Sequence, residues 1–178
     1  MADPDLSLLA RRVAKGDVEA FAGIVRETQG RLYRLAARLS GSTNDAEDVL
    51  QEAYVKAFNA LQEQRFDGRS SVQTWLYRIV SNAAIDATRR RKARPVSNPD
   101  DAEPREDSSV DPEGRMALRE LDEWLSELSV EQRSVLILRA VEGFSTVETA
   151  EILGCSEGAV EQRLIRARAN LNKRRGET

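Results

Sequence analysis

An acidic, proline-rich segment at residues 95–115 divides the chain and limits what it can fold into. The segment holds four prolines and almost no large apolar side chain, and residues 96–114 carry a net charge of −6. It cannot bury enough apolar surface to offset the entropy lost on ordering, so we predict a flexible linker. We therefore expect two small domains, residues 1–94 and 116–178, either of which reaches well over a turn of DNA from the other.

Apolar residues on both sides of the linker recur every three to four positions, which is the spacing of amphipathic helices. Before the linker, four such series run from Leu6 to Val13, Phe21 to Leu39, Ala46 to Leu61 and Val72 to Ala83. Gly41 interrupts the pattern, and Asn44 with Glu47 three residues later is predicted to cap the third helix. No segment shows the sustained alternation of a strand, so the predicted fold class is all-α.

The part after the linker has the spacing of a helix-turn-helix. It begins with leucines at helical spacing, Leu118, Leu121, Leu125 and Leu128, followed by a predicted helix from Ser129 to Gly143. The stretch STVETAEILGCSEGAVEQRLIRARANL then predicts two helices joined by a tight turn at Gly154, with Ala150 and Leu153 packed against the second helix. An ordinary helical hairpin has the same pattern, but the turn chemistry, the small Ala150 and the basic tail favour DNA binding.

The second helix of this pair presents a polar stripe away from its packed face. The stripe consists of Glu161, Gln162, Ile165, Arg166 and Arg168, and residues 161–178 carry a net charge of +4. Arginines bind phosphates or guanine edges, and an exposed isoleucine suits thymine methyl groups.

A second basic surface lies directly before the linker. Helical spacing places Arg78, Asn82, Asp86 and Arg89 on one stripe, and Arg90, Arg91 and Lys92 follow. Asparagine can bind a base edge, and the basic run, free to meet the DNA backbone, can neutralise phosphates. The alternative is a solvated helix end in which Asp86 merely pairs with an arginine and the cations suit the helix macrodipole.

A third surface follows from the stretch DAEDVLQEAYVKAF. Asp48, Gln51, Glu52, Val55 and Lys56 lie off its buried face. This pattern is typical of a solvated helix surface, and it equally suits a docking site for a basic partner helix.

Composition argues against catalysis and against membrane insertion. The chain has no histidine and one cysteine, Cys155, so a disulfide framework, a zinc site or a histidine-based catalytic apparatus has almost nothing to be built from. We expect no catalytic residues, no metal and no cofactor. No apolar run approaches the roughly 20 residues that cross a bilayer, and the start has no signal-peptide pattern, so we expect a cytoplasmic protein.

Three motifs in one order, DAEDVLQEAYVKAF, WLYRIVSNAAIDATRRRK and EGFSTVETAEILGCSEGAVEQRLIRARANL, resemble the extracytoplasmic-function (ECF, group IV) sigma factors of the sigma-70 family. The resemblance covers nearly the whole chain. It implies that residues 1–94 are sigma region 2 and residues 116–178 are sigma region 4. It also implies a promoter-specificity subunit of bacterial RNA polymerase with no catalysis of its own.

The resemblance implies a role for each surface. Asp48, Gln51, Glu52 and Val55 match the surface that docks on the β′ clamp helices of core RNA polymerase. The loop FDGRSSVQTW, with Arg78, Asn82, Asp86, Arg89, Arg90, Arg91 and Lys92, matches the element that recognises the −10 region as single-stranded DNA and holds a flipped base. Ser156, Glu161, Gln162, Arg163, Ile165 and Arg166 match the reader of the −35 element as duplex.

Further partners follow from the same resemblance. Leu136 and Leu138 lie where the family packs region 4 and contacts the β flap. The acidic linker either mimics RNA inside polymerase or is a simple tether, and an anti-sigma factor is the family's usual partner.

Two residues depart from the family pattern, Glu161 and Thr149. Glu161 repels phosphate but can accept from cytosine N4, so we expect an effect on the choice of −35 sequence. Thr149 replaces a common aliphatic residue, which predicts looser packing of the helix pair. The alternative functions are a dimeric helix-turn-helix regulator that acts without entering polymerase, and a decoy that titrates an anti-sigma factor.

Overall fold

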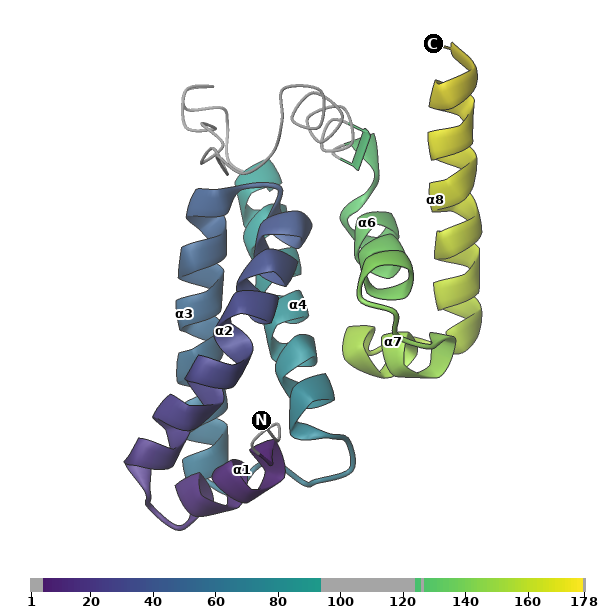
Figure 1. Ribbon diagram of the computed structural model, residues 1–178. Helices are drawn as coiled ribbons and strands as arrows, with labels where there is room; N and C mark the ends of the chain where they lie inside the picture. Colours follow the sequence, from purple (N-terminus) through teal and green to yellow (C-terminus); the bar gives the residue numbers. More distant parts are fainter. Residues whose placement is uncertain (1–4, 94–123, 126, 178) are drawn as a thin grey trace.

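The computed structural model describes residues 5–93, 124–125 and 127–177 of the chain (Figure 1). Within those residues every regular element is helical, which confirms the predicted all-α class. The elements are α1 (Leu6–Ala14), α2 (Val18–Ser40), α3 (Thr43–Gln62), α4 (Val72–Ala93), α6 (Val130–Leu136), η2 (Ile137–Val141), α7 (Thr146–Leu153) and α8 (Glu157–Glu177). The predicted linker and the leucines at 118 and 121 lie outside the described residues.

Helices α1 to α4 pack around one apolar core. In Figure 1, α2, α3 and α4 run alongside one another and α1 lies across one end of them. Helix α2 contributes leucines and α3 contributes alanines to the contact, and Leu32, Leu35, Leu39, Ala46, Ala53 and Ala57 are each at most 2% exposed. The small alanines let the helices approach closely while the leucines fill the space between them, so the predicted inward faces are confirmed.

A two-residue turn joins α2 to α3. Gly41 ends α2 with a φ of 68°, a left-handed conformation that strains residues with a side chain. Ser42 follows in an extended conformation, and its hydroxyl accepts a hydrogen bond from the Asp45 backbone N–H at 3.2 Å. Ser42 is therefore the N-cap of α3. The predicted cap at Asn44 was wrong by two residues, because α3 begins as soon as the glycine has ended α2.

The single helix predicted between Ser129 and Gly143 consists of two parts. A capping box between Ser129 and Gln132 opens α6, in agreement with the predicted start. From Ile137 the chain continues as the π-helical turn η2, in which the Glu142 N–H donates to the Ile137 carbonyl at 3.0 Å. Gly143, with a φ of 77°, then ends the element as predicted.

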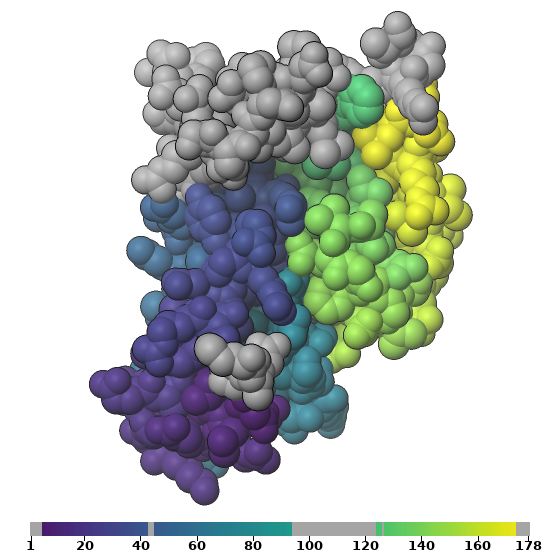
Figure 2. All heavy atoms as spheres, viewed as in Figure 1, coloured from purple at the N-terminus to yellow at the C-terminus, as the bar shows by residue number. Residues whose placement is uncertain are grey.

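The two halves of the chain pack against each other along α4. We call this contact the seam: Ile137, Leu138 and Ile152 are at most 1% exposed, and they belong to the same buried cluster as the core of α1 to α4. Figure 2 shows the green surface of α6 and α7 adjoining the blue and teal surface of the first half. In this structure the halves are thus in contact, whereas the linker composition predicted that they can move apart.

A buried arginine crosses the seam next to the α2–α3 turn. Arg133 is 4% exposed, and its guanidinium donates to the carbonyl of Leu125 at 2.9 Å and to that of Leu39 at 3.5 Å. Its Nη1 atom would lie 2.9 Å from a Cβ atom placed on Gly41. The glycine therefore makes room for the cation that joins the halves.

Candidate nucleic-acid interface

The helix-turn-helix predicted from the sequence is formed by α7 and α8. Ala150, Val160 and Leu164 are buried against one another, with Leu153 packed beside them. Gly154 makes the turn with a φ of 61°. Thr149 is fully buried, and among the described residues its hydroxyl has no hydrogen-bond partner. The departure at Thr149 therefore places a polar atom in the core, which costs free energy, and the expected looser packing of the helix pair stays a prediction.

The outer face of α8 carries most of the predicted −35 residues. Glu161, Gln162, Ile165, Arg166 and Arg168 are all exposed, and Ile165 is 65% exposed. Glu161 does not point freely into solvent, because its Oε1 accepts a hydrogen bond from the Thr146 hydroxyl at 2.7 Å. The carboxylate is thereby held beside the start of α7, which leaves the rest of the face to the neutral and basic side chains.

Two other predicted −35 residues have local structural contacts. The hydroxyl of Ser156 accepts from the Ala159 N–H at 3.2 Å, which caps α8. Arg163 is partly buried, and its guanidinium donates to the Cys155 sulfur at 3.3 Å. The structure thus brings four of the six predicted residues together on the open face of α8. The other two, Ser156 and Arg163, make their contacts at or beside the turn.

The predicted −10 residues share one exposed face of α4. Arg78, Asn82, Asp86 and Arg89 are all exposed, as their spacing predicted. Asn82 and Asp86 also line a cavity of about 540 Å³ between α3 and α4. Its other polar and aromatic lining residues include Lys56, Asn59, Arg65 and Trp75. Trp75 is the last residue of the loop FDGRSSVQTW that the resemblance assigned to −10 recognition. Sequence reasoning missed Asn59 and Arg65, although Lys56 and Asn59 stand three residues apart on α3 and therefore share a face.

The basic run after Asp86 is largely engaged in ion pairs at the protein surface, and its expected contact with DNA stays a prediction. Arg89 donates to Glu131 of α6 at 2.8 Å, and Arg91 donates to the Asp45 carboxylate at 2.5 Å and to the Ser40 carbonyl at 2.7 Å. A third ion pair joins Arg90 to Glu52 at 3.6 Å. Hydrogen bonding to the Arg89 guanidinium holds the pKa of the Glu131 carboxyl below its usual value. These ion pairs form because α3 and α6 both present carboxylates beside the end of α4.

The alternative interpretation, in which Asp86 mainly neutralises an arginine, has little support in the geometry. The Arg89–Asp86 pair spans 3.9 Å, and both side chains are more than half exposed. A solvent-exposed ion pair of this kind contributes little to the stability of the fold. Asp86 therefore remains available to the cavity that it shares with Asn82.

The predicted polymerase-docking stripe lies along the open side of α3. Asp48 and Gln51 are exposed, and Val55 is 60% exposed. Glu52 is engaged, with its Oε1 accepting from Lys56 at 2.6 Å, and this hydrogen bond lowers the pKa of its carboxyl. Asp48, Gln51 and Val55 thus form an open patch of mixed polarity.

A polar cluster that sequence reasoning missed closes the seam. The Tyr77 hydroxyl donates to Glu142 Oε2 at 2.9 Å, and Arg38 donates to Glu142 Oε1 at 3.0 Å. Phe144 stacks edge-on against Tyr77, with ring centroids 4.8 Å apart. Burial, together with the Glu142 carboxylate, raises the pKa of Tyr77 above its ordinary value. Leu138 is fully buried in the seam, so in this arrangement it is covered, whereas Leu136 is partly exposed.

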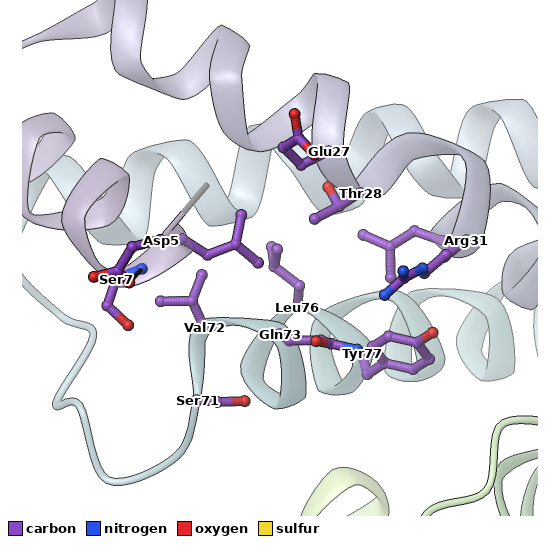
Figure 3. A pocket seen from close by; sticks show the side chains of 12 residues that line it. Asp5, Ser7, Glu27, Thr28, Arg31, Ser71, Val72, Gln73, Leu76 and Tyr77 are labelled. Carbon is purple, nitrogen blue, oxygen red and sulfur yellow. Dashed lines mark hydrogen bonds between the residues drawn. The ribbon is translucent and has the colours of Figure 1, made fainter. Parts of the chain in front are cut away.

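A separate cavity of about 280 Å³ lies between α1, α2 and α4. Figure 3 shows the side chains that line it. Leu32, Val72 and Leu76 form its apolar side, and Glu27, Arg31 and Tyr77 stand at its rim. An apolar recess of this kind can take a side chain flanked by a charge. In the described part of the chain no group of carboxylate and thiol side chains is arranged to hold a metal ion, and no helix is long and apolar enough to span a membrane.

These features define a two-part helical protein in which a helix-turn-helix is packed on a helical bundle. Comparison with known proteins gives the family. The profile described as Sigma-70 region 2 matches residues 24–94, and that described as Sigma-70, region 4 matches residues 118–171. The chain belongs to the ECF sigma factors of the sigma-70 family, which are transcription initiation factors.

Similar proteins cover nearly the whole chain. ECF RNA polymerase sigma factor SigM of Mycobacterium tuberculosis is 39% identical over 94% of this chain and 82% of its own length. SigW of Bacillus subtilis is 32% identical over 92% of each chain. The solved structure of CnrH in complex with the cytosolic domain of CnrY superposes with a TM-score of 0.68, at 32% identity and 95% coverage of both chains. The likeness confirms the predicted family.

Proposed function

We propose that this chain binds core RNA polymerase, directs it to promoters with two short elements and opens the upstream edge of the transcription bubble, without catalysing a reaction of its own. The observation that carries the proposal is the pairing of an open reader helix, α8, with a polar cavity that contains Asn82 and Asp86. One surface suits duplex DNA and the other suits an extruded base, and promoter opening needs both.

The −10 element is held at the cavity between α3 and α4. Asn82 and Asn59 offer amide donors and acceptors to the edge of an extruded base, and Trp75 supplies an aromatic wall. Lys56 and Arg65 in the same cavity neutralise the neighbouring phosphates. Contacts of this kind offset the free energy spent on unstacking the base.

The −35 element is read by α8 in the major groove. Gln162 and Arg166 contact base edges or phosphates, and Ile165 contacts a thymine methyl group. Arg163 and Ser156 support this reader by fixing the turn and the start of the helix.

Core polymerase is bound mainly through the open patch on α3. Asp48, Gln51 and Val55 suit the basic and apolar side chains of the β′ clamp helices, and Glu52 joins them when Lys56 moves away. Region 4 meets the β flap through the helices around Leu136 and Leu138. We also propose residues 1–94 and 116–178 as the two domains, residues 95–115 as the linker, and the cytoplasm as the place of action.

An anti-sigma factor is the proposed regulator. Two similar proteins are solved with partner proteins: CnrH with the cytosolic domain of CnrY, and the sigma factor RpoE with the anti-sigma factor NepR from Bartonella quintana. RpoE is 27% identical to this chain, with a TM-score of 0.67 over 88% of it.

Run-off transcription tests the proposal. Core polymerase reconstituted with the full chain selects promoter fragments from a random pool, and the selected fragments are then transcribed. Specific start sites are expected with the chain and absent with core alone. A folded chain that gives no specific initiation would refute the proposal, and tight duplex binding by a dimer without core would favour a helix-turn-helix regulator instead.

A further inference from the structure

A second polar cavity lies on the other side of the segment that joins α3 to α4. Its volume is about 650 Å³, and it is formed by one face of α1, the end of α3 and the connecting segment. Helix α1 precedes the part of the chain matched by the region 2 profile, which begins at residue 24. None of the surfaces assigned above includes α1.

Two cations of α1 face this cavity without compensation. Arg11 and Lys15 are one helical turn apart and both exposed, and within the described residues neither side chain makes a hydrogen bond or an ion pair. The neighbouring Arg12 differs, because its Nε donates to Asp17 at 2.8 Å. Cations in a last helical turn also suit the macrodipole, which explains a charge there but not the cavity beneath it.

The carboxylate of Asp67, which lines the same cavity, is already engaged. It accepts from the Arg69 backbone N–H at 3.1 Å and lies 3.4 Å from the Arg69 guanidinium. Arg11 and Lys15 outnumber this one carboxylate, so the charges that line the cavity favour an anion.

An aromatic pair joins this cavity to the one that contains Asn82. Phe66 lines the α1 cavity and Trp75 lines the cavity between α3 and α4, and their ring centroids are 4.8 Å apart. The two cavities therefore stand on either side of one aromatic contact.

A strained residue stands at the mouth of the α1 cavity. Gln64 has a φ of 55°, and among the described residues it alone adopts a positive φ without being glycine. It ends α3, where Arg65 N–H donates to the Ala60 carbonyl at 2.8 Å, and glycine fills this position without strain. Strained side chains occur at functional sites, and the amide of Gln64 can both donate and accept.

We propose that the α1 cavity binds the nucleotide of single-stranded promoter DNA next to the one held beside Asn82, on the side away from the basic run at the end of α4. Arg11 and Lys15 bind its phosphates, Phe66 stacks on its base and Gln64 hydrogen-bonds to it. This inference rests on the proposed function, because it continues the path of the same strand. Charge and aromatic surface together are what unpaired DNA requires.

The test measures binding of the full chain to fluorescein-labelled oligothymidylate over a range of salt concentrations. The Arg11→Gln, Lys15→Gln double variant is compared with Arg26→Gln, Arg34→Gln, which removes the same charge from an exposed face of α2. Two lost phosphate contacts lower the slope of log affinity against log salt by about 1.4 in the first variant, and the control keeps the wild-type slope. Equal slopes in the two variants would overturn the proposal.

Gln64→Gly gives a second readout that a purely structural role would not produce. Removing the strain is expected to raise the melting temperature by about 2–4 °C, while oligothymidylate affinity falls at least about 3-fold. A more stable variant with unchanged affinity would overturn the role of Gln64. The α1 site alone would be refuted if wild-type holoenzyme gave specific run-off transcription and the α1 variants bound oligothymidylate as wild type does. The proposed function itself would be refuted if wild-type holoenzyme gave no specific run-off transcription.

Discussion

The hydroxyl of Tyr77 in α4 donates a hydrogen bond to Glu142 at 2.9 Å, across 65 positions of sequence. The same carboxylate accepts from Arg38 of α2, so one glutamate that follows η2 binds two helices of the first half. Tyr77 is 3% exposed. Because both groups lose water in this contact, the seam is held by a polar cluster as well as by apolar packing.

Tyr77→Phe is expected to lower the free energy of unfolding by about 1–2 kcal/mol, because Glu142 loses one donor while it stays mostly buried. Urea denaturation measures the change. Tyr33→Phe is the matched control, since Tyr33 is partly buried and makes no hydrogen bond to another described residue. Equal effects of the two substitutions would show that the Glu142 contact does not contribute.

The same tyrosine predicts a pH dependence. Its pKa is raised in the folded chain, so above about pH 10 the unfolded chain releases this proton while the folded chain retains it. The stabilisation is therefore complete below pH 10 and is lost as the pH rises beyond it. Urea midpoints of wild type and Tyr77→Phe should differ by a constant amount below about pH 10 and converge as the pH rises above it. The pKa of Tyr54 is also raised, but Tyr54 is present in both proteins, so its contribution cancels in the difference.

Glu131→Gln is expected to release Arg89 and to increase the affinity of the free chain for promoter DNA about 2- to 5-fold at low salt. The ion pair is partly exposed, so the loss in unfolding free energy should stay below about 1 kcal/mol. Fluorescence anisotropy with a fork-junction fragment measures the binding. Glu151→Gln, an exposed carboxylate on α7, removes the same charge elsewhere and should give a smaller increase.

Asn82→Ala is expected to slow open-complex formation by about 10-fold or more while duplex binding at the −35 element is retained, since Asn82 lines the cavity proposed for the extruded base and lies outside the helix-turn-helix. Permanganate reactivity of thymines reports the opening, and a gel shift with −35 duplex reports the binding. Equal loss of both activities would mean that Asn82 has a structural role.

Glu161→Arg is expected to change the preferred −35 sequence more than the −10 sequence, because it replaces an acidic side chain that stands beside Gln162 and Ile165 on the open face of α8. Selection of bound fragments by the two holoenzymes measures both preferences. Glu161→Gln separates charge from geometry, since its amide oxygen can still accept from Thr146. An unchanged −35 base profile in the arginine variant would contradict the assignment.

Local signals sufficed for much of the fold. Glycines at 41 and 154 end helices because their backbones take positive φ, and Ser129 caps α6 through a side chain three residues away. These interactions lie within a few residues, so the sequence alone predicts them. The π-helical turn at Ile137 was not predictable in this way, because its hydrogen bonds depend on how η2 packs in the seam.

The sequence of α4 indicates that more than one of its faces is buried, but the prediction assigned it a single buried face. Besides the predicted inward residues, Tyr77, Val80, Ala84 and Ile85 are buried, so α4 is apolar around most of its circumference. A helix of that kind is covered on more than one side. The local pattern does not show which part of the chain covers α4. It also does not show that Glu131 pairs with Arg89, because that contact joins distant parts of the chain.

Gly41 has two structural roles in the turn between α2 and α3. A side chain there would strain the local backbone and would also press on the Arg133 guanidinium that reaches across to Leu39. One position thus couples the end of a helix in region 2 to the attachment of region 4. A change at this residue would alter the folding of one half and its separation from the other together, so the two properties cannot be tuned independently there.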